Sequence, residues 1–164
     1  MSRRNVVFLL LMLLLSVVLE VSLLPVYLTS SFKPDLLLII MVFLGLRASF
    51  EAGTLLVWLL GLIKDSFSGL YLGLNAFAFL LIFFVIKSTS TRLYSDSPGL
   101  FVISVCAATL VCCTLNILLL LMFTSSGGIS YSILSDLLPH LLINSFTASL
   151  VALFPWFEMA QEES

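Results

Sequence analysis

The sequence predicts an all-α protein that crosses a membrane several times, and three observations support this fold class. Hydrophobic residues make up 61 % of the chain and charged residues only 10 %, whereas a soluble domain carries about 25 % charged residues. The mean hydropathy is +1.23. The apolar residues also gather in runs, and a spanning helix needs about 20 of them. We therefore expect a polytopic integral membrane protein with six transmembrane helices in a single domain, residues 1–164.

Four of the six helices are predicted from apolar runs of full length. The first covers residues 5–24 and ends before Pro25. It follows Arg3 and Arg4 as a signal peptide would, but it is too long for a typical apolar region and lacks an A-x-A cleavage site. We expect it to be a retained helix. Polar loops separate the other three runs, which cover residues 69–88, 98–123 and 132–155.

Two shorter runs, 34–47 and 51–64, lie between the first and fourth helices. Pro34 is expected in the first turn of its helix, where a missing N–H group costs nothing. At 1.5 Å per residue each run covers only about 20 Å of a bilayer core of about 30 Å. They form either two short helices or a re-entrant hairpin, and both arrangements need neighbouring helices to shield the backbone.

The basic residues favour six spans with both termini in the cytoplasm. This topology places five of the seven basic residues on the cytoplasmic side, as the positive-inside rule requires. A re-entrant hairpin would break the alternation. Under the six-span topology the cytoplasmic residues are Arg3, Arg4, Arg47, Lys87 and Arg92, and the external ones are Lys33 and Lys64.

The stretch GLIKDSFSGLYLGLNAF, residues 61–77, places charges between two apolar runs. Gly61, Gly69 and Gly73 have the spacing of small residues that lets helices approach closely in lipid. Asp65, or a serine beside it, can accept hydrogen bonds from the N–H groups that open the next helix. One interpretation is a capped, close-packed corner. The other is that Asp65 faces a pocket or binds a partner chain.

One further acid, Glu20, lies near the external end of the first helix. Its side chain can extend to the membrane interface, as long charged side chains do near helix ends. The alternative is an ion pair with Lys33 or Lys64, which the six-span topology places on the same side of the membrane. Both interpretations stay open at the level of the sequence.

Asp136, His140 and Asn144 recur at intervals of four in the last run, so they share one helix face beside Pro139. An Asp–His pair suggests a proton relay or catalysis. However, the chain has a single histidine and no serine in a G-x-S-x-G context. We expect a polar stripe that joins helices, and no enzyme.

Metal, cofactor and nucleic-acid binding are not expected either. The three cysteines lie in one apolar run without the spacing of a metal site. The net charge is −2, and only the N-terminal basic pair forms a cluster of positive charge.

Residues 33–79 carry a set of motifs that resembles a known family. These are a basic residue, proline and aspartate that open an apolar helix (Lys33, Pro34 and Asp35), a glycine after the charged corner (Gly53), G-x-x-x-D (Gly61 to Asp65) and S-G-x-x-x-G (Ser68 to Gly73). With the chain length, the N-terminal basic pair and the long fifth span, they are similar to the rod shape-determining protein MreD family.

The resemblance implies a non-catalytic scaffold in the bacterial inner membrane that supports rod shape and lateral peptidoglycan synthesis. The implied partners are the membrane helix of MreC and, indirectly, MreB, RodA and a penicillin-binding protein, all within the lipid bilayer. The partner-binding or structural residues would be Gly61, Asp65, Gly69, Gly73, Pro34 and Asp35.

The resemblance also implies a six-helical fold similar to the substrate-binding component of energy-coupling-factor transporters. This likeness leaves a second hypothesis open, a small-molecule (vitamin-like) binding component of a membrane transporter. A vitamin-binding component should present aromatic and polar side chains around an external cavity. A scaffold should instead present a lipid-facing apolar groove.

Overall fold

The computed structural model describes residues 3–23, 33–68, 73–90, 97–123 and 127–153, which form helices and no strand. The all-α class is therefore confirmed. The first helix, α1 (Arg3–Val18), continues into one π-helical turn, η1 (Leu19–Leu23). The others are α3 (Leu36–Arg47), α4 (Phe50–Ser68), α5 (Leu74–Ser90), α6 (Pro98–Phe123) and α7 (Gly127–Ala152).

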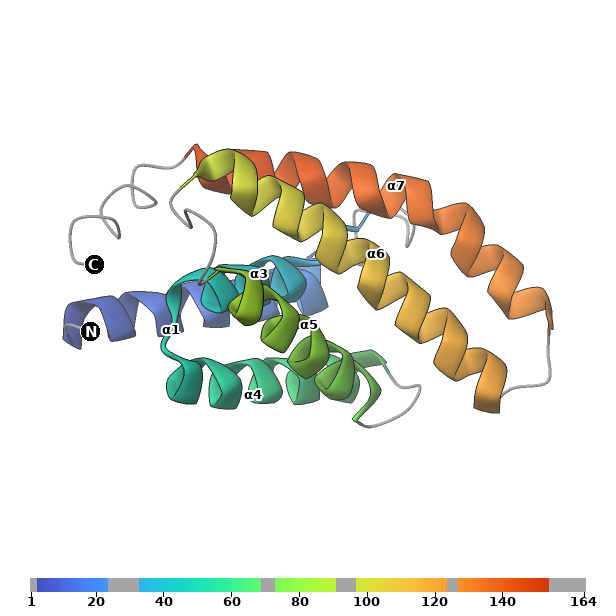
Figure 1. The fold of residues 1–164 in the computed structure, drawn as a ribbon, viewed down its shortest axis with the longest axis horizontal. Coiled ribbons are helices and arrows are strands. Elements are labelled where there is room, and N and C mark those ends of the chain that lie inside the picture. The colour runs from blue at the N-terminus through green and yellow to red at the C-terminus, as the bar shows by residue number, and fades with distance from the viewer. Residues whose placement is uncertain (1–2, 24–32, 69–72, 91–96, 124–126, 154–164) are drawn as a thin grey trace.

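Consecutive helices run in opposite directions, so that α1 begins and α7 ends at the same side of the bundle (Figure 1). The short helix α3 lies at the centre, because it packs against α1, α4, α5, α6 and α7. Eight of its twelve residues are buried. A helix that is apolar on all sides is one surrounded by other helices, which explains the sequence LLLIIMVFLGLR. The hairpin of α6 and α7 extends past the other helices (Figure 1).

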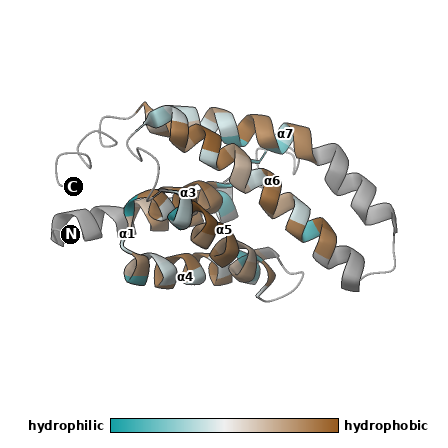
Figure 2. Ribbon diagram, viewed as in Figure 1, coloured by the Kyte–Doolittle hydropathy of each residue, from teal (hydrophilic) through white to brown (hydrophobic). Residues whose placement is uncertain are grey.

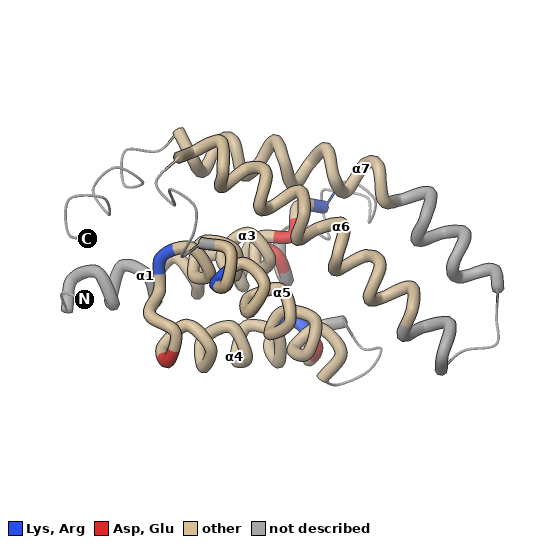
Figure 3. Tube along the Cα trace, in the orientation of Figure 1, with Lys and Arg blue, Asp and Glu red and all other residues tan. Residues whose placement is uncertain are grey.

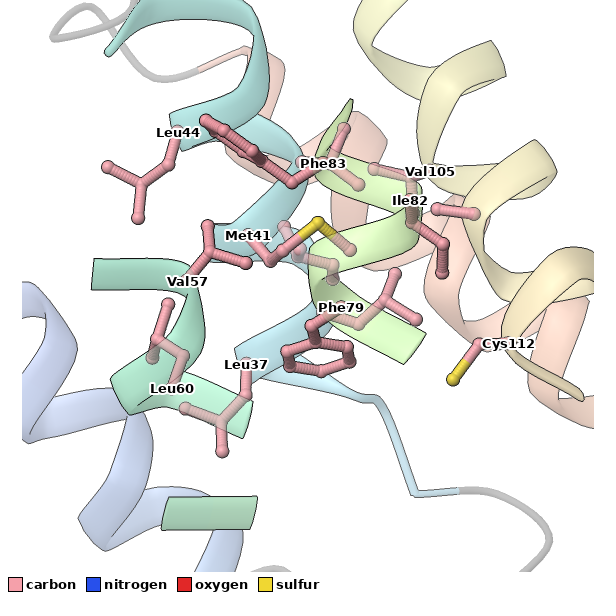
Figure 4. Packing of buried hydrophobic residues seen from close by; sticks show 14 of the residues in the cluster. Leu37, Met41, Leu44, Val57, Leu60, Phe79, Ile82, Phe83, Val105 and Cys112 are labelled. Atoms are coloured by element: carbon pink, nitrogen blue, oxygen red, sulfur yellow. The ribbon is translucent and has the colours of Figure 1, made fainter. Parts of the chain in front are cut away.

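The core forms where α3 meets its neighbours. Figure 4 shows side chains of α3, α4, α5 and α6 pointing toward one another, among them Leu37, Met41, Val57, Phe79, Phe83 and Val105. Apolar residues also cover the outer faces of the helices (Figure 2). Large side chains such as Leu55, Trp58 and Phe77 are exposed there. An apolar exterior of this kind suits lipid rather than water.

The length of the helices bears on the predicted number of spans. In the part of the chain that the structure describes, Pro98–Leu118 is the one stretch that is clearly long and apolar enough to cross a membrane. The segments Leu36–Arg47, Leu74–Thr89 and Leu137–Ala152 are apolar but shorter. The six helices are present, whereas six complete spans stay a prediction.

The helices α3, α5 and α7 do not begin where the sequence predicted. Pro34 lies outside α3, because Asp35 is the N-cap, so the prediction of a first-turn proline is wrong. The fourth predicted helix, α5, begins at Leu74 rather than at residue 69, since Gly73 has a φ of 98°, which a right-handed helix excludes. The last helix, α7, begins at Gly127, five residues earlier than predicted.

The helix α4 is longer than the sequence suggested. It contains 19 residues and continues through Lys64 and Asp65 to Ser68, where the prediction ended at residue 64. Its length is about 28 Å, close to the thickness of a bilayer core, while the 12-residue α3 covers only about 18 Å. Of the two helices that the sequence predicted to be short, α3 and α4, only α3 is short.

Candidate functional site

Two carboxylates satisfy the free backbone N–H groups at the amino end of α3. Asp35 Oδ1 accepts a hydrogen bond from the Leu38 N–H at 3.1 Å. Glu20 reaches the same end from η1, and its Oε2 accepts from the Leu37 N–H at 3.1 Å. The first N–H groups of a helix have no partner within it and carry about half a positive charge. Two acidic side chains are therefore stabilised at this point.

Lys64, a residue of α4, provides a positive charge beside these two carboxylates. Its ammonium forms an ion pair with Asp35 Oδ2 and lies 5.1 Å from the centre of the Phe79 ring. Glu20 is only 8 % exposed and turns inward, so the interpretation that it extends to the membrane interface is wrong. Its hydrogen bond goes to the backbone of α3, while Lys64 pairs with Asp35.

Asn144 joins α6 and α7 to the same place. Its Oδ1 accepts from the Asp35 N–H at 2.8 Å, and its Nδ2 donates to Thr109 Oγ1 at 3.2 Å. Figure 3 shows acidic and basic positions gathered where α3 begins and α4 ends. We refer to the following residues as the charged cluster: Glu20, Asp35, Lys64, Thr109 and Asn144. The charged cluster links η1, α3, α4, α6 and α7 through polar contacts.

Asp65 holds the start of α5. The residue is 2 % exposed, and its two oxygens accept backbone hydrogen bonds from three described residues. Oδ2 accepts from the N–H groups of Gly73 (2.9 Å) and Ala76 (3.1 Å). Oδ1 accepts from the backbone N–H and the side-chain amide of Asn75, both at 2.9 Å. A residue of α4 thus caps the next helix, and the carboxylate needs both of its oxygens to do so.

The three glycines of this corner have different positions. A Cβ atom added to Gly61 would lie 2.2 Å from Ala76 Cα, so the backbones of α4 and α5 are in direct contact there. Apart from its chain neighbours, no described residue lies within 4 Å of a Cβ added to Gly73. The close packing expected at Gly73 is therefore wrong, and its positive φ is what requires glycine. Gly69 lies outside the described residues.

An apolar groove lies between α5 and α6, with a volume of about 380 Å³. Its floor is buried and consists of Leu46 from α3, Ile82 from α5 and Ala108 from α6. Thr89 and Ser104 are the two residues with hydroxyl groups among its lining residues. We call this feature the α5–α6 groove. Its lining from α6 is Leu100, Ser104, Ala107, Ala108, Val111 and Leu115.

Sequence comparison assigns the chain to a family. A family model described as rod shape-determining protein MreD matches residues 2–161 of the 164 residues. The chain belongs to the MreD family. No curated protein and no solved structure matches it. Membership implies a role in determining rod shape, in a bacterial membrane, and the family is a shape-determining one rather than a known enzyme family.

In this MreD chain the structure describes two side chains of the predicted polar stripe, and their contacts differ. Asn144 is 2 % exposed and belongs to the charged cluster. His140 is half-buried in α7 and makes no hydrogen bond to a described residue. The side chain of Asp136 lies outside the described residues. Helical spacing places these residues on one face, and of the two whose side chains the structure describes, Asn144 reaches the amino end of α3 and His140 does not.

Two features of the candidate site were not predicted from the sequence. Thr109 was not singled out, although a threonine inside an apolar run is a polar group that needs a partner. The small residues Ser104 and Ala108 were not singled out either, although their spacing of four is the small-x-x-x-small pattern of helix contacts in lipid. Both signals were present in the sequence, but neither identifies the partner element.

Proposed function

We propose that this MreD protein is a non-catalytic membrane scaffold of the cell-elongation machinery and that the α5–α6 groove binds the transmembrane helix of MreC. Rod-shape determination follows from the family. MreC binding, support of lateral peptidoglycan synthesis and indirect links to MreB, RodA and a penicillin-binding protein are the proposed details. A cell depleted of the protein is expected to lose its rod shape and become round.

The α5–α6 groove is the observation that carries this proposal. Along α6 its lining extends from Leu100 to Leu115, which is about 22 Å, or four helical turns. Ser104, Ala107 and Ala108 form its middle, where small side chains let a second backbone approach closely. Apolar contact alone gains nothing over lipid, so a groove that permits close packing is what a docking helix requires.

The charged cluster and the Asp65 corner hold in place two of the helices that line the groove. Asp35 and Lys64 fix α3, which provides the floor residue Leu46. Asp65 fixes the start of α5, which provides one wall. Buried polar networks that are fully satisfied make a core rigid. A rigid groove loses little conformational entropy when a partner helix binds, and this favours a scaffold role.

The proposed topology has six spans, with both termini in the cytoplasm. Arg47 and Lys87 lie in the last turns of α3 and α5, and both helices end at the side where α1 begins (Figure 1). This distribution agrees with the positive-inside rule if that side is cytoplasmic. The groove would then lie across the bilayer with Leu100 near the cytoplasmic surface and Leu115 deeper.

The hypothesis of a vitamin-like ligand receives less support from the groove. Such a ligand requires several polar groups that converge on it. The lining of the groove contains the hydroxyl groups of Thr89 and Ser104 and is otherwise apolar. We therefore do not extend the proposal to a transported substrate or to a fold relationship with energy-coupling-factor transporters.

Site-specific photocrosslinking in cells tests the proposal. A photoreactive amino acid at Val85, Ala107 or Val111, which line the groove and are exposed, should capture MreC. The matched controls are Leu55 and Leu59 on the exposed face of α4, outside the groove. Capture from the controls but not from the groove positions would show that MreC docks elsewhere. Capture from neither, with a vitamin-like molecule retained after purification, would favour the transporter hypothesis.

A further inference from the structure

Ser104 differs from most hydroxyl-bearing residues of the described helices. Eight of these hydroxyl groups donate a hydrogen bond to the carbonyl oxygen four residues earlier in the same helix, and this satisfies them inside an apolar environment. The eight residues are Thr54, Ser66, Thr89, Thr109, Thr114, Ser145, Thr147 and Ser149. Ser104 Oγ has no hydrogen-bond partner among the described residues, and Ser104 lines the α5–α6 groove.

The surroundings of Ser104 make its hydroxyl reachable from outside. The residue is half-buried on α6, one helical turn before the small side chains of Ala107 and Ala108, which also line the groove. The buried residues Leu46 and Ile82 belong to the same lining. A second helix seated in the groove could therefore bring its backbone to the distance of an O–H···O hydrogen bond, about 2.7 Å.

We propose that Ser104 fixes the register of the docked transmembrane helix by donating its hydroxyl hydrogen to a backbone carbonyl of that helix. This inference rests on the proposed function, and it adds a requirement on the partner. The docked helix must carry Gly, Ala or Ser at its crossing point, because a larger side chain would cover the carbonyl and hold the backbones apart. The remaining lining is apolar except for Thr89, whose hydroxyl already donates within its own helix, so no other lining side chain offers a hydrogen bond that would fix the register.

The test maps where the partner helix is crosslinked. With a photoreactive amino acid at Ala107, the unsubstituted chain should crosslink to one residue of the MreC helix or to its immediate neighbour. In Ser104→Ala the crosslinks should spread to residues three or four positions away. The amount of MreC retained after detergent extraction should fall roughly threefold to twentyfold, the range for one hydrogen bond between membrane helices.

Thr89→Val is the matched control in the same groove. The Thr89 hydroxyl already donates to the Val85 carbonyl at 2.8 Å, so its removal should change neither the crosslinked residue nor the retention. Ser104→Ala removes one oxygen and adds no volume, and the amount of folded protein in the membrane should equal that of the unsubstituted chain.

The outcomes separate this inference from the proposed function. An unchanged crosslinking position and unchanged retention in Ser104→Ala would overturn the role of Ser104 while leaving MreC docking in place. Equal losses in Ser104→Ala and Thr89→Val would also overturn it, because the satisfied hydroxyl would then matter as much as the free one. If the unsubstituted chain captures no MreC from Ala107, the proposed function itself fails, and this inference fails with it.

Discussion

Replacing Asp65 by asparagine should destabilise the protein, although asparagine is normally an equivalent N-cap residue. The reason lies in how the carboxylate is used. Oδ1 accepts from the backbone and the side chain of Asn75, and Oδ2 accepts from the N–H groups of Gly73 and Ala76. The amide of asparagine has only one acceptor oxygen. In Asp65→Asn a donor NH₂ group would face two N–H donors.

The expected cost follows from the two lost hydrogen bonds. A buried donor left without a partner costs about 1–3 kcal/mol, so two of them cost about 2–6 kcal/mol. Asp65 is 2 % exposed, and solvent cannot replace the missing acceptor. Because the protein would lose the start of α5, we expect Asp65→Asn to lower the amount of folded protein and not merely its activity.

The assay is thermal unfolding of detergent-purified protein, followed by size-exclusion chromatography of the heated sample. Ser66→Ala is the matched control, since Ser66 is exposed and its hydroxyl donates only to the Leu62 carbonyl of its own helix. The control should unfold within a degree or two of the original chain. An Asp65→Asn variant that unfolds at the original temperature would refute the two-oxygen argument.

Three further predictions concern the corner, the charged cluster and the topology. Gly61→Leu should reduce the amount of folded protein in the membrane, because even a Cβ at this position would collide with the Ala76 backbone. Gly73→Ala should lower the free energy of unfolding by only about 1–2 kcal/mol, the cost of a positive φ for alanine. Membrane yields and melting temperatures check both variants. Lys64→Met should cost about 1–3 kcal/mol in thermal unfolding, because it leaves the partly buried Asp35 carboxylate without its ion pair. The added change Asp35→Asn should restore part of this stability, and no restoration would contradict the ion-pair argument. A reporter fused within residues 88–97 should lie in the cytoplasm, and an external signal would overturn the six-span topology.

The sequence determined the class of this protein and the existence of its helices. Long apolar runs with few charges can be stable only as helices in lipid, because every backbone N–H and C=O group must be paired there. The helix ends were less predictable, since they depend on side chains that compete for the same N–H groups. The helix α3 begins after Asp35 rather than at Pro34, and the positive φ of Gly73 delays the start of α5.

The Asp65 corner was partly predictable from the sequence. Its acceptor and the helix it caps are separated by only eight to eleven residues, so the motif itself contains most of the interaction. The contact of Gly61 with Ala76 also lies within this stretch. The need for both carboxylate oxygens was not predictable, because it depends on the angle at which α5 leaves the turn.

Only the tertiary structure decided the charged cluster and the α5–α6 groove. The N–H of Asp35 finds its acceptor in Asn144, 109 residues later, and the groove exists only because α5 and α6 lie against α3 at a particular distance. Spacing along one helix determines which residues share a face. It does not determine which other helix that face meets, because many helices of similar apolar composition could pack there with similar energies.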